Sequence, residues 1–167
     1  MNAQPLPFDP IEEARRHWVE HKWETAASGM AAVTSIMRAQ QIVLSRIDTV
    51  LRPLGLTFAR YEMLMLLEFS SEGQLPMRII GERLQVHPTS VTSAVDKLET
   101  EGLVKRVPHP NDRRAVLVQL LPSGHELGAQ ATRHLNEAVF ENLGLGHQEE
   151  RALTKLLGQL RQSAGDF

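Results

Sequence analysis

Apolar residues recur at helical spacing along most of the chain, and proline and glycine interrupt the pattern at a few places. The pattern predicts a helix over about 10–24, begun by Asp9 and Pro10, and a longer one over about 26–53. Thr57 is expected to cap a third helix, which ends at the polar segment SSEGQLP. The long second helix is apolar on too many sides to stand alone.

Two short helices are predicted next, over about 77–84 and 88–101, with residues 85–87 as the turn between them and Gly102 as the end. In the second helix Val91, Ala94, Val95 and Leu98 form the apolar stripe. The same helix then exposes small polar and charged residues, namely Thr89, Ser90, Thr92, Ser93, Asp96 and Lys97. This arrangement predicts a helix-turn-helix.

An antiparallel hairpin is predicted after Gly102, with one strand around Leu103 to Val107 and the other over 115–121. Its tip is expected to hold Asn111, Asp112, Arg113 and Arg114. Two further helices are predicted over about 122–143 and 147–163, separated by the turn LGLG. The predicted fold class is mainly α with a small β-hairpin wing.

Length and composition add few constraints. A chain of 167 residues, 42% of them hydrophobic, can bury one core by itself. It has neither an apolar run of about 18 residues nor a basic and apolar leader, so a cytoplasmic location is expected. Cysteine is absent, which excludes disulfides and thiolate metal sites. No cofactor is predicted.

Charge points to a local nucleic-acid site. The net charge is -2, yet Lys105, Arg106, Arg113 and Arg114 cluster around one acid, Asp112. An α-helix fits the major groove of DNA, and arginines of a neighbouring hairpin suit the minor groove. The exposed hydroxyl residues of the second short helix are therefore expected to contact bases or phosphates. These are Thr89, Ser90, Thr92 and Ser93.

The basic residues are expected to contact DNA in different ways. We predict phosphate contacts for Lys97, Lys105 and Arg106, and DNA contact for at least one of Arg113 and Arg114. Asp112 is expected to orient a neighbouring arginine. The alternative for the whole group is a solvated turn and a capped helix start.

The order of these motifs resembles the MarR family of winged helix-turn-helix repressors. The resemblance rests on TSAVDKLETEG at 92–102, on Asp112-Arg113-Arg114 at the wing, and on LPSG at 121–124, where Pro122 stands in place of the usual threonine. It implies a single domain over 1–167, with dimerisation helices at 9–54 and 122–167 and a DNA-binding lobe at 55–121. It also implies a homodimeric repressor on a pseudo-palindromic operator.

The extra N-terminal helix, with Trp18 and Trp23, is similar to that of the urate-responsive subgroup of this family. That subgroup's ligand set has a carboxylate in the third helix and an arginine in the recognition helix, and the corresponding residues here are Glu62 and Ala94, so the arginine is missing. The family resemblance, an apolar cleft expected at Trp18, and Arg60 predict a small organic effector, anionic or aromatic. Its candidate residues are Trp18, His21, Arg38, Arg60 and Glu62.

Each effector candidate also has a plainer interpretation. The tryptophans suit a core or an interface, and the two arginines suit ordinary ion pairs. His17 and His21 are spaced for a metal, but without a third ligand nearby we expect hydrogen-bonded structural roles and no metal site.

Two other function classes compete with a ligand-responsive regulator. A constitutive or architectural DNA-binding protein would share every motif and differ only in that no small molecule releases the DNA. An enzyme is not expected, because the sequence has neither a phosphate-binding glycine motif nor a nucleophile elbow.

Overall fold

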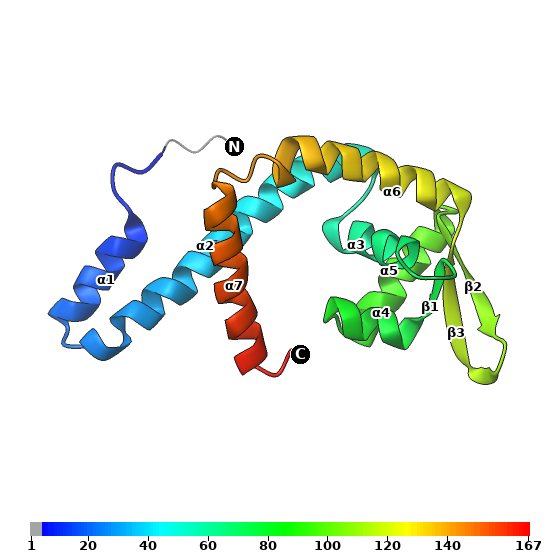
Figure 1. The fold of residues 1–167 in the computed structure, drawn as a ribbon, viewed down its shortest axis with the longest axis horizontal. Helices are drawn as coiled ribbons and strands as arrows, with labels where there is room; N and C mark the ends of the chain where they lie inside the picture. The colour runs from blue at the N-terminus through cyan, green and yellow to red at the C-terminus, as the bar shows by residue number, and fades with distance from the viewer. Residues whose placement is uncertain (1–4) are drawn as a thin grey trace. The chain divides into compact units, whose positions relative to one another are not determined.

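The computed structural model describes residues 5–167, except for the side chains of Arg113 and Arg114. The chain forms two compact units, Met1–Thr49 and Val50–Phe167, which are described separately. Helices dominate both, and a small antiparallel sheet belongs to the second, so the predicted fold class is confirmed (Figure 1). No helix in the described part of the chain is long and apolar enough to cross a membrane.

The first unit consists of α1 (Pro10–Glu20) and most of α2 (Glu24–Leu51). The Asp9 carboxylate caps α1 by accepting the Ile11 N–H at 2.9 Å. The prediction of a helix to residue 24 was wrong, because Lys22 has φ +63° and turns the chain between the two helices. α2 was predicted to within two residues at each end.

The second unit opens with a short 3₁₀ turn, Arg52–Leu54, and then builds a helical lobe from α3 (Phe58–Glu68), α4 (Met77–Leu84) and α5 (Pro88–Thr100). All three helices were expected, and Thr57 caps α3 as predicted, accepting the Arg60 N–H at 3.4 Å. Their apolar faces form a common core. Its fully buried members include Leu64, Leu67, Ile80, Val91, Val95 and Leu98.

The sheet has three strands, β1 (Gln74–Pro76), β2 (Val104–His109) and β3 (Asp112–Leu120), in the order β1-β3-β2. β1 was missed, since three residues ending in proline give no alternating pattern. The prediction that Asp112, Arg113 and Arg114 lie at the hairpin tip was wrong. Asp112 already pairs with His109, so the turn consists of Pro110 and Asn111 and the arginines follow inside β3.

The chain ends with α6 (Pro122–Leu135), a π-helical segment η2 (Asn136–Phe140) and α7 (His147–Ser163). The expected single helix over 122–143 therefore changes its hydrogen-bonding pattern at Asn136 and stops at Phe140. Gly124 is required where α6 begins, because a Cβ there would lie 2.2 Å from the Leu103 carbonyl oxygen. This close approach fixes α6 against the end of the turn that leads into β2.

Candidate nucleic-acid interface

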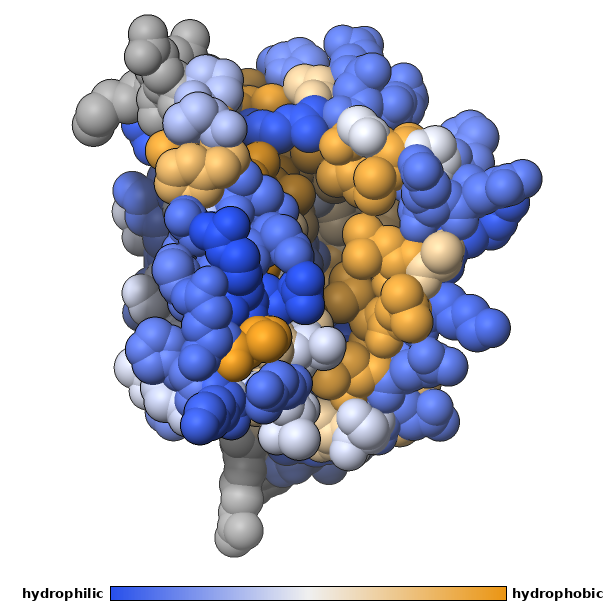
Figure 2. All heavy atoms as spheres, turned by 90° about the vertical axis from the view of Figure 1, so that its left-hand side faces the viewer, coloured by the Kyte–Doolittle hydropathy of each residue, from blue (hydrophilic) through white to orange (hydrophobic). Residues whose placement is uncertain are grey.

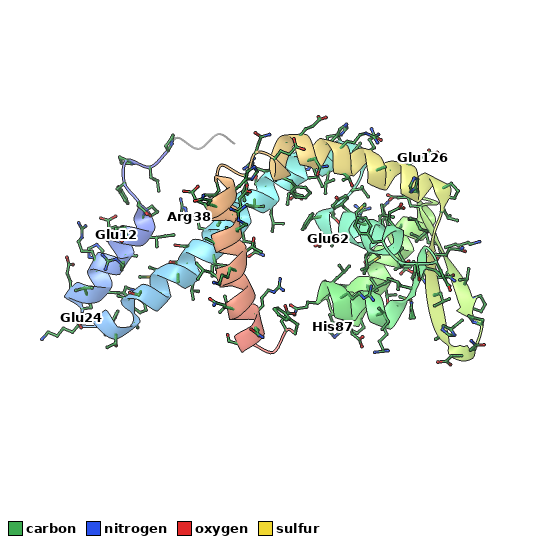
Figure 3. The ribbon with its side chains drawn as sticks, viewed as in Figure 1. Glu12, Glu24, Arg38, Glu62, His87 and Glu126 are labelled. Atoms are coloured by element: carbon green, nitrogen blue, oxygen red, sulfur yellow. The ribbon has the colours of Figure 1, made fainter. Side chains whose placement is uncertain are left out.

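The second helix of the helix-turn-helix, α5, begins with a histidine cap. The Thr89 N–H donates to His87 Nδ1 at 3.3 Å, and the Thr89 hydroxyl lies 3.1 Å from the same nitrogen (His87 is labelled in Figure 3). Pro88 occupies the first helical position, where its missing N–H costs nothing. The sequence placed His87 in a turn and gave no sign that its ring caps the helix.

The hydroxyl residues predicted to contact DNA share the exposed side of α5. Val91, Val95 and Leu98 are buried on the other side, which fixes the rotation of the helix. The exposed set is Thr89, Ser90, Thr92 and Ser93. The Thr92 hydroxyl donates to the Pro88 carbonyl at 3.1 Å, so its oxygen is left as an acceptor for an outside donor.

Two carboxylates on α5 hold Arg106 of β2. Its Nη2 lies 2.6 Å from Asp96 Oδ1, its Nη1 lies 2.5 Å from Glu99 Oε2, and its backbone N–H donates to Glu99 Oε1 at 2.7 Å. The backbone N–H and the guanidinium of Arg106 together lower the pKa of Glu99. Burial disfavours the charged guanidinium, but the hydrogen bonds to both acids outweigh this and raise the pKa of Arg106.

A third acid, Glu101, joins α5 to α3. Its carboxylate lies 3.1 Å from Lys97 Nζ and 3.4 Å from Arg60 Nη1. Lys97 remains 58% exposed and able to turn toward a phosphate, whereas the Arg60 side chain is only 15% exposed. Sequence reasoning assigned no role to Asp96, Glu99 or Glu101, although acids so close to a basic cluster are a usable signal for ion pairs.

The hairpin beside α5 supplies the remaining basic residues. Lys105 is exposed on β2. The backbones of Arg113 and Arg114 lie in β3, while their side chains lie outside what the structure describes. Their contact with DNA therefore stays a prediction, as does the orienting role of Asp112.

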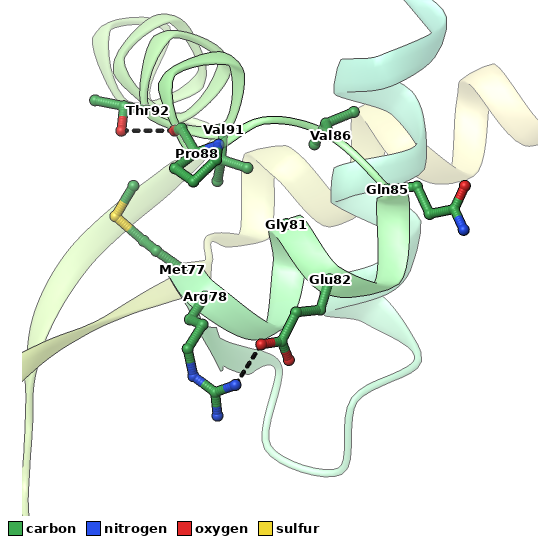
Figure 4. Close-up of a pocket in the computed structure, with 9 residues that line it drawn as sticks. All are labelled: Met77, Arg78, Gly81, Glu82, Gln85, Val86, Pro88, Val91 and Thr92. Atoms are coloured by element: carbon green, nitrogen blue, oxygen red, sulfur yellow. Dashed lines mark hydrogen bonds and ion pairs between the residues drawn. The ribbon is translucent and has the colours of Figure 1, made fainter. Parts of the chain in front are cut away.

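Two hollows flank α5. One, of about 580 Å³, lies between α4 and α5, where Gly81 lets the helices approach and Arg78 pairs with Glu82 (Figure 4). The other, of about 500 Å³, lies between the start of α3 and α5 and brings Arg60 together with predicted DNA contacts. Its lining is Thr57, Ala59, Arg60, Thr89, Ser90, Ser93, Ala94 and Lys97.

The effector candidates are divided between the two units. Trp18 and His21 belong to an aromatic cluster around Trp23, with ring centroids 5.4 Å apart for the tryptophan pair and 5.3 Å for His21 and Trp23. Arg38 is exposed on α2 in the same unit. Arg60 and Glu62 lie on α3, and burial raises the pKa of the Glu62 carboxyl (Figure 3).

His17 of α1 and His21, the residue that follows α1, both form hydrogen bonds within the same segment. His17 Nδ1 lies 2.9 Å from Glu20 Oε2, and His21 Nδ1 lies 2.8 Å from the His17 carbonyl oxygen. Within residues 5–167, no group of three or more His, Asp or Glu side chains is arranged to hold a metal ion.

A helix-turn-helix followed by a β-hairpin, here β2 and β3 with β1 added at the β3 edge, defines the winged-helix class of proteins. Residues 56–116 match the MarR family model. Sco5413 from Streptomyces coelicolor, a MarR family transcriptional regulator, is 49% identical and aligns with a TM-score of 0.77 over 84% of this chain and 97% of its own. The chain belongs to the MarR family, which is a family of transcriptional regulators and not of enzymes.

Other relatives are also described as transcriptional regulators. YhbI from Bacillus subtilis, an uncharacterised HTH-type transcriptional regulator, is 30% identical over 133 residues, covering 80% of this chain and 79% of its own. The chain spans 64% of the length of two regulators that it matches, from Mycobacterium bovis and Mycobacterium tuberculosis.

Two solved structures of CouR are each 26% identical to this chain. One is a repressor bound to a 23-mer DNA duplex, with a TM-score of 0.70 over 75% of this chain and 89% of its own. The other, from Rhodococcus jostii RHA1, is bound to p-coumaroyl-CoA, with a TM-score of 0.65 over 77% and 88%.

Proposed function

We propose that this regulator is a homodimeric repressor that binds a pseudo-palindromic operator. The observation that carries the proposal is the exposed hydroxyl face of α5, which lies opposite a buried apolar stripe and beside a basic hairpin. Small hydroxyl side chains can bond base edges in the major groove, and Lys97 and Lys105 can bind the phosphates on either side. The DNA-bound structure of CouR supports the same use of the fold.

Unpartnered apolar stripes support the homodimer. α7 buries none of its residues, yet Leu153, Leu156 and Leu160 recur along one side of it and are 41–64% exposed. α2 exposes Val33, Ile36 and Met37 in the same way. Figure 2 shows apolar side chains gathered on one face of the molecule. Because such stripes mark protein interfaces, a second copy of the chain is their natural partner.

Selection from random duplexes tests the proposal. Full-length protein at near-physiological salt is mixed with the pool, and the retained DNA is sequenced. Two-fold symmetry predicts an inverted repeat with half-site centres about 10 base pairs apart. Retention without any enriched sequence would favour a constitutive or architectural DNA-binding protein.

The proposed regulation is release of DNA by a small anionic or aromatic acid. The hollow between α3 and α5 supports it, because Arg60 supplies a partly buried positive charge among hydroxyl groups that DNA also needs. A ligand that binds one spacing of the two recognition helices better than the other shifts the population accordingly. The structure of CouR bound to p-coumaroyl-CoA shows that one relative binds an organic ligand.

Thermal-shift screening of aromatic and organic acids tests the regulation, with the selected operator as the second readout. A ligand that raises the melting temperature should also release the operator. Arg60→Gln should remove both effects. An unchanged melting temperature across the screen would refute the proposed effector without contradicting the proposed DNA binding.

A further inference from the structure

Among the basic side chains of the predicted DNA-binding surface that the structure describes, Arg106 forms the most ion pairs. Its side chain is 26% exposed and forms ion pairs with both Asp96 and Glu99. A side chain that binds a phosphate needs donors that face solvent, whereas both Nη atoms of this guanidinium already donate to acids. A role different from phosphate binding follows.

The two acids belong to the recognition helix itself. Asp96 follows Thr92 by four residues and Ser93 by three, so it lies one turn along the same exposed side of α5. Glu99 lies one turn further and accepts both the backbone N–H and the guanidinium of Arg106. β2 packs against α5 (Figure 1). The ion pairs of Arg106 with Asp96 and Glu99, called the clamp below, join the two elements across the turn at Gly102, whose φ is +68°.

Arg106 also neutralises the negative charge of Asp96 and Glu99. Without Arg106, two carboxylates would stand uncompensated within about two turns of the predicted base contacts, where they would repel phosphate. The guanidinium meets the two acids with two separate nitrogen atoms, Nη1 and Nη2, whereas lysine presents a single compact, strongly hydrated charge. The clamp therefore depends on arginine and not merely on a positive residue.

We propose that Arg106 is a positioning residue for operator recognition: through Asp96 and Glu99 it fixes the angle of α5 relative to the β2–β3 wing. It acts through the recognition helix and does not contact the phosphate backbone. The inference rests on the proposed function, since it assigns how α5 and the wing engage one operator together.

The experiment compares binding of the selected operator with binding of unrelated duplex for wild type, Arg106→Lys, Glu99→Ala and the double variant. A positioning role predicts that each single change lowers the ratio of specific to non-specific affinity by about tenfold or more, that the double variant loses little further, and that the salt slope on unrelated DNA is unchanged.

Two matched controls separate the alternatives. Lys105→Gln, at the next position and exposed, should lower the salt slope by about one unit on every sequence and leave the ratio unchanged. Val104→Ala, in the core of the same strand, should lower the melting temperature and also leave the ratio unchanged. A lower ratio of specific to non-specific affinity, with an unchanged salt slope, is therefore expected only for changes in the clamp.

A phosphate contact predicts the opposite pattern. Arg106→Lys would then bind the operator like wild type, and Glu99→Ala would tighten binding because it removes a negative charge; either result overturns the proposal. A wild-type protein without sequence preference would instead refute the proposed function. The clamp is then tested by hydrogen exchange, where Glu99→Ala must speed exchange of the Arg106 amide while Lys105→Gln does not, and equal rates would refute it.

Discussion

His125 Nδ1 lies 2.7 Å from Glu68 Oε2, which ties the first turn of α6 to the last residue of α3. The hydrogen bond and the charge of Glu68 raise the pKa of His125 above 6.5, and Glu126 adds to the effect. The folded protein therefore holds the proton more tightly than the unfolded chain does. The resulting stability is fully present below about pH 6.5 and is lost as pH rises through the raised pKa.

Replacing His125 should therefore lower the stability of the protein only at acidic pH. His125→Gln is expected to lower the melting temperature at about pH 6 and to melt like wild type at about pH 8.5. The effect is small, because the side chain is 58% exposed. Glu68→Gln should abolish the same pH dependence. A gap between wild type and His125→Gln that is equal at both pH values would show that the ion pair contributes nothing.

Gly124 is predicted to tolerate no side chain. A Cβ would lie 2.2 Å from the Leu103 carbonyl oxygen and 2.8 Å from Leu120 Cδ1, so α6 would have to move. We expect Gly124→Ala to lower the free energy of unfolding by about 1–3 kcal/mol in urea titration. Gly158→Ala, in the middle of α7 with no neighbour within 4 Å, is the control and should gain up to about 1 kcal/mol. Equal effects would contradict the close approach.

The leucine stripe of α7 should control the oligomeric state. Leu156→Asp with Leu160→Asp is expected to raise the dimer dissociation constant by at least about 100-fold, since each buried leucine contributes about 1.5–3 kcal/mol. Sedimentation then reports the mass of one chain. Phe69→Asp, which alters a side chain 79% exposed at the end of α3, should leave the mass unchanged. A dimer that survives the double change would place the interface elsewhere.

The wing arginines should contribute binding that carries little sequence information. Arg113→Ala with Arg114→Ala is expected to weaken every duplex and to lower the salt slope by about one unit for each phosphate that the variant no longer binds. Ser93→Ala should instead cost about 1–3 kcal/mol on the operator and little on unrelated DNA. Titrations at several salt concentrations distinguish the two. An unchanged slope in the arginine variant would move the phosphate contacts to other residues.

Local signals explain how much of this fold the sequence could predict. The bounds of α4 and the start of α5 were readable because apolar periodicity and Pro88 agree there. The early end of α1 was not, since Lys22 adopts a positive φ without being glycine. β1 exists only through its pairing with β3, from Gln74 opposite Gln119 to Pro76 opposite Leu117, which no local pattern reveals.

Some features of the candidate site could likewise be predicted from the sequence, and others could not. The exposed hydroxyls of α5 follow from helical periodicity alone. The pairing of Arg106 with Asp96 and Glu99 depends on how β2 packs against α5, and charge counting placed this arginine with the free basic residues. His87 as a cap is likewise a matter of ring orientation. Residue type was therefore informative about the chemistry of the surface but not about which charges are already paired.

The spacing of the operator half-sites tests the central claim most directly. The selected operator is compared with a single half-site and with a version carrying about half a helical turn of extra DNA between the half-sites. A rigid two-fold dimer predicts that both changes weaken binding by about 100-fold or more, because only one recognition helix can then reach its groove. Equal affinity for all three duplexes would contradict a homodimer that reads two half-sites at once.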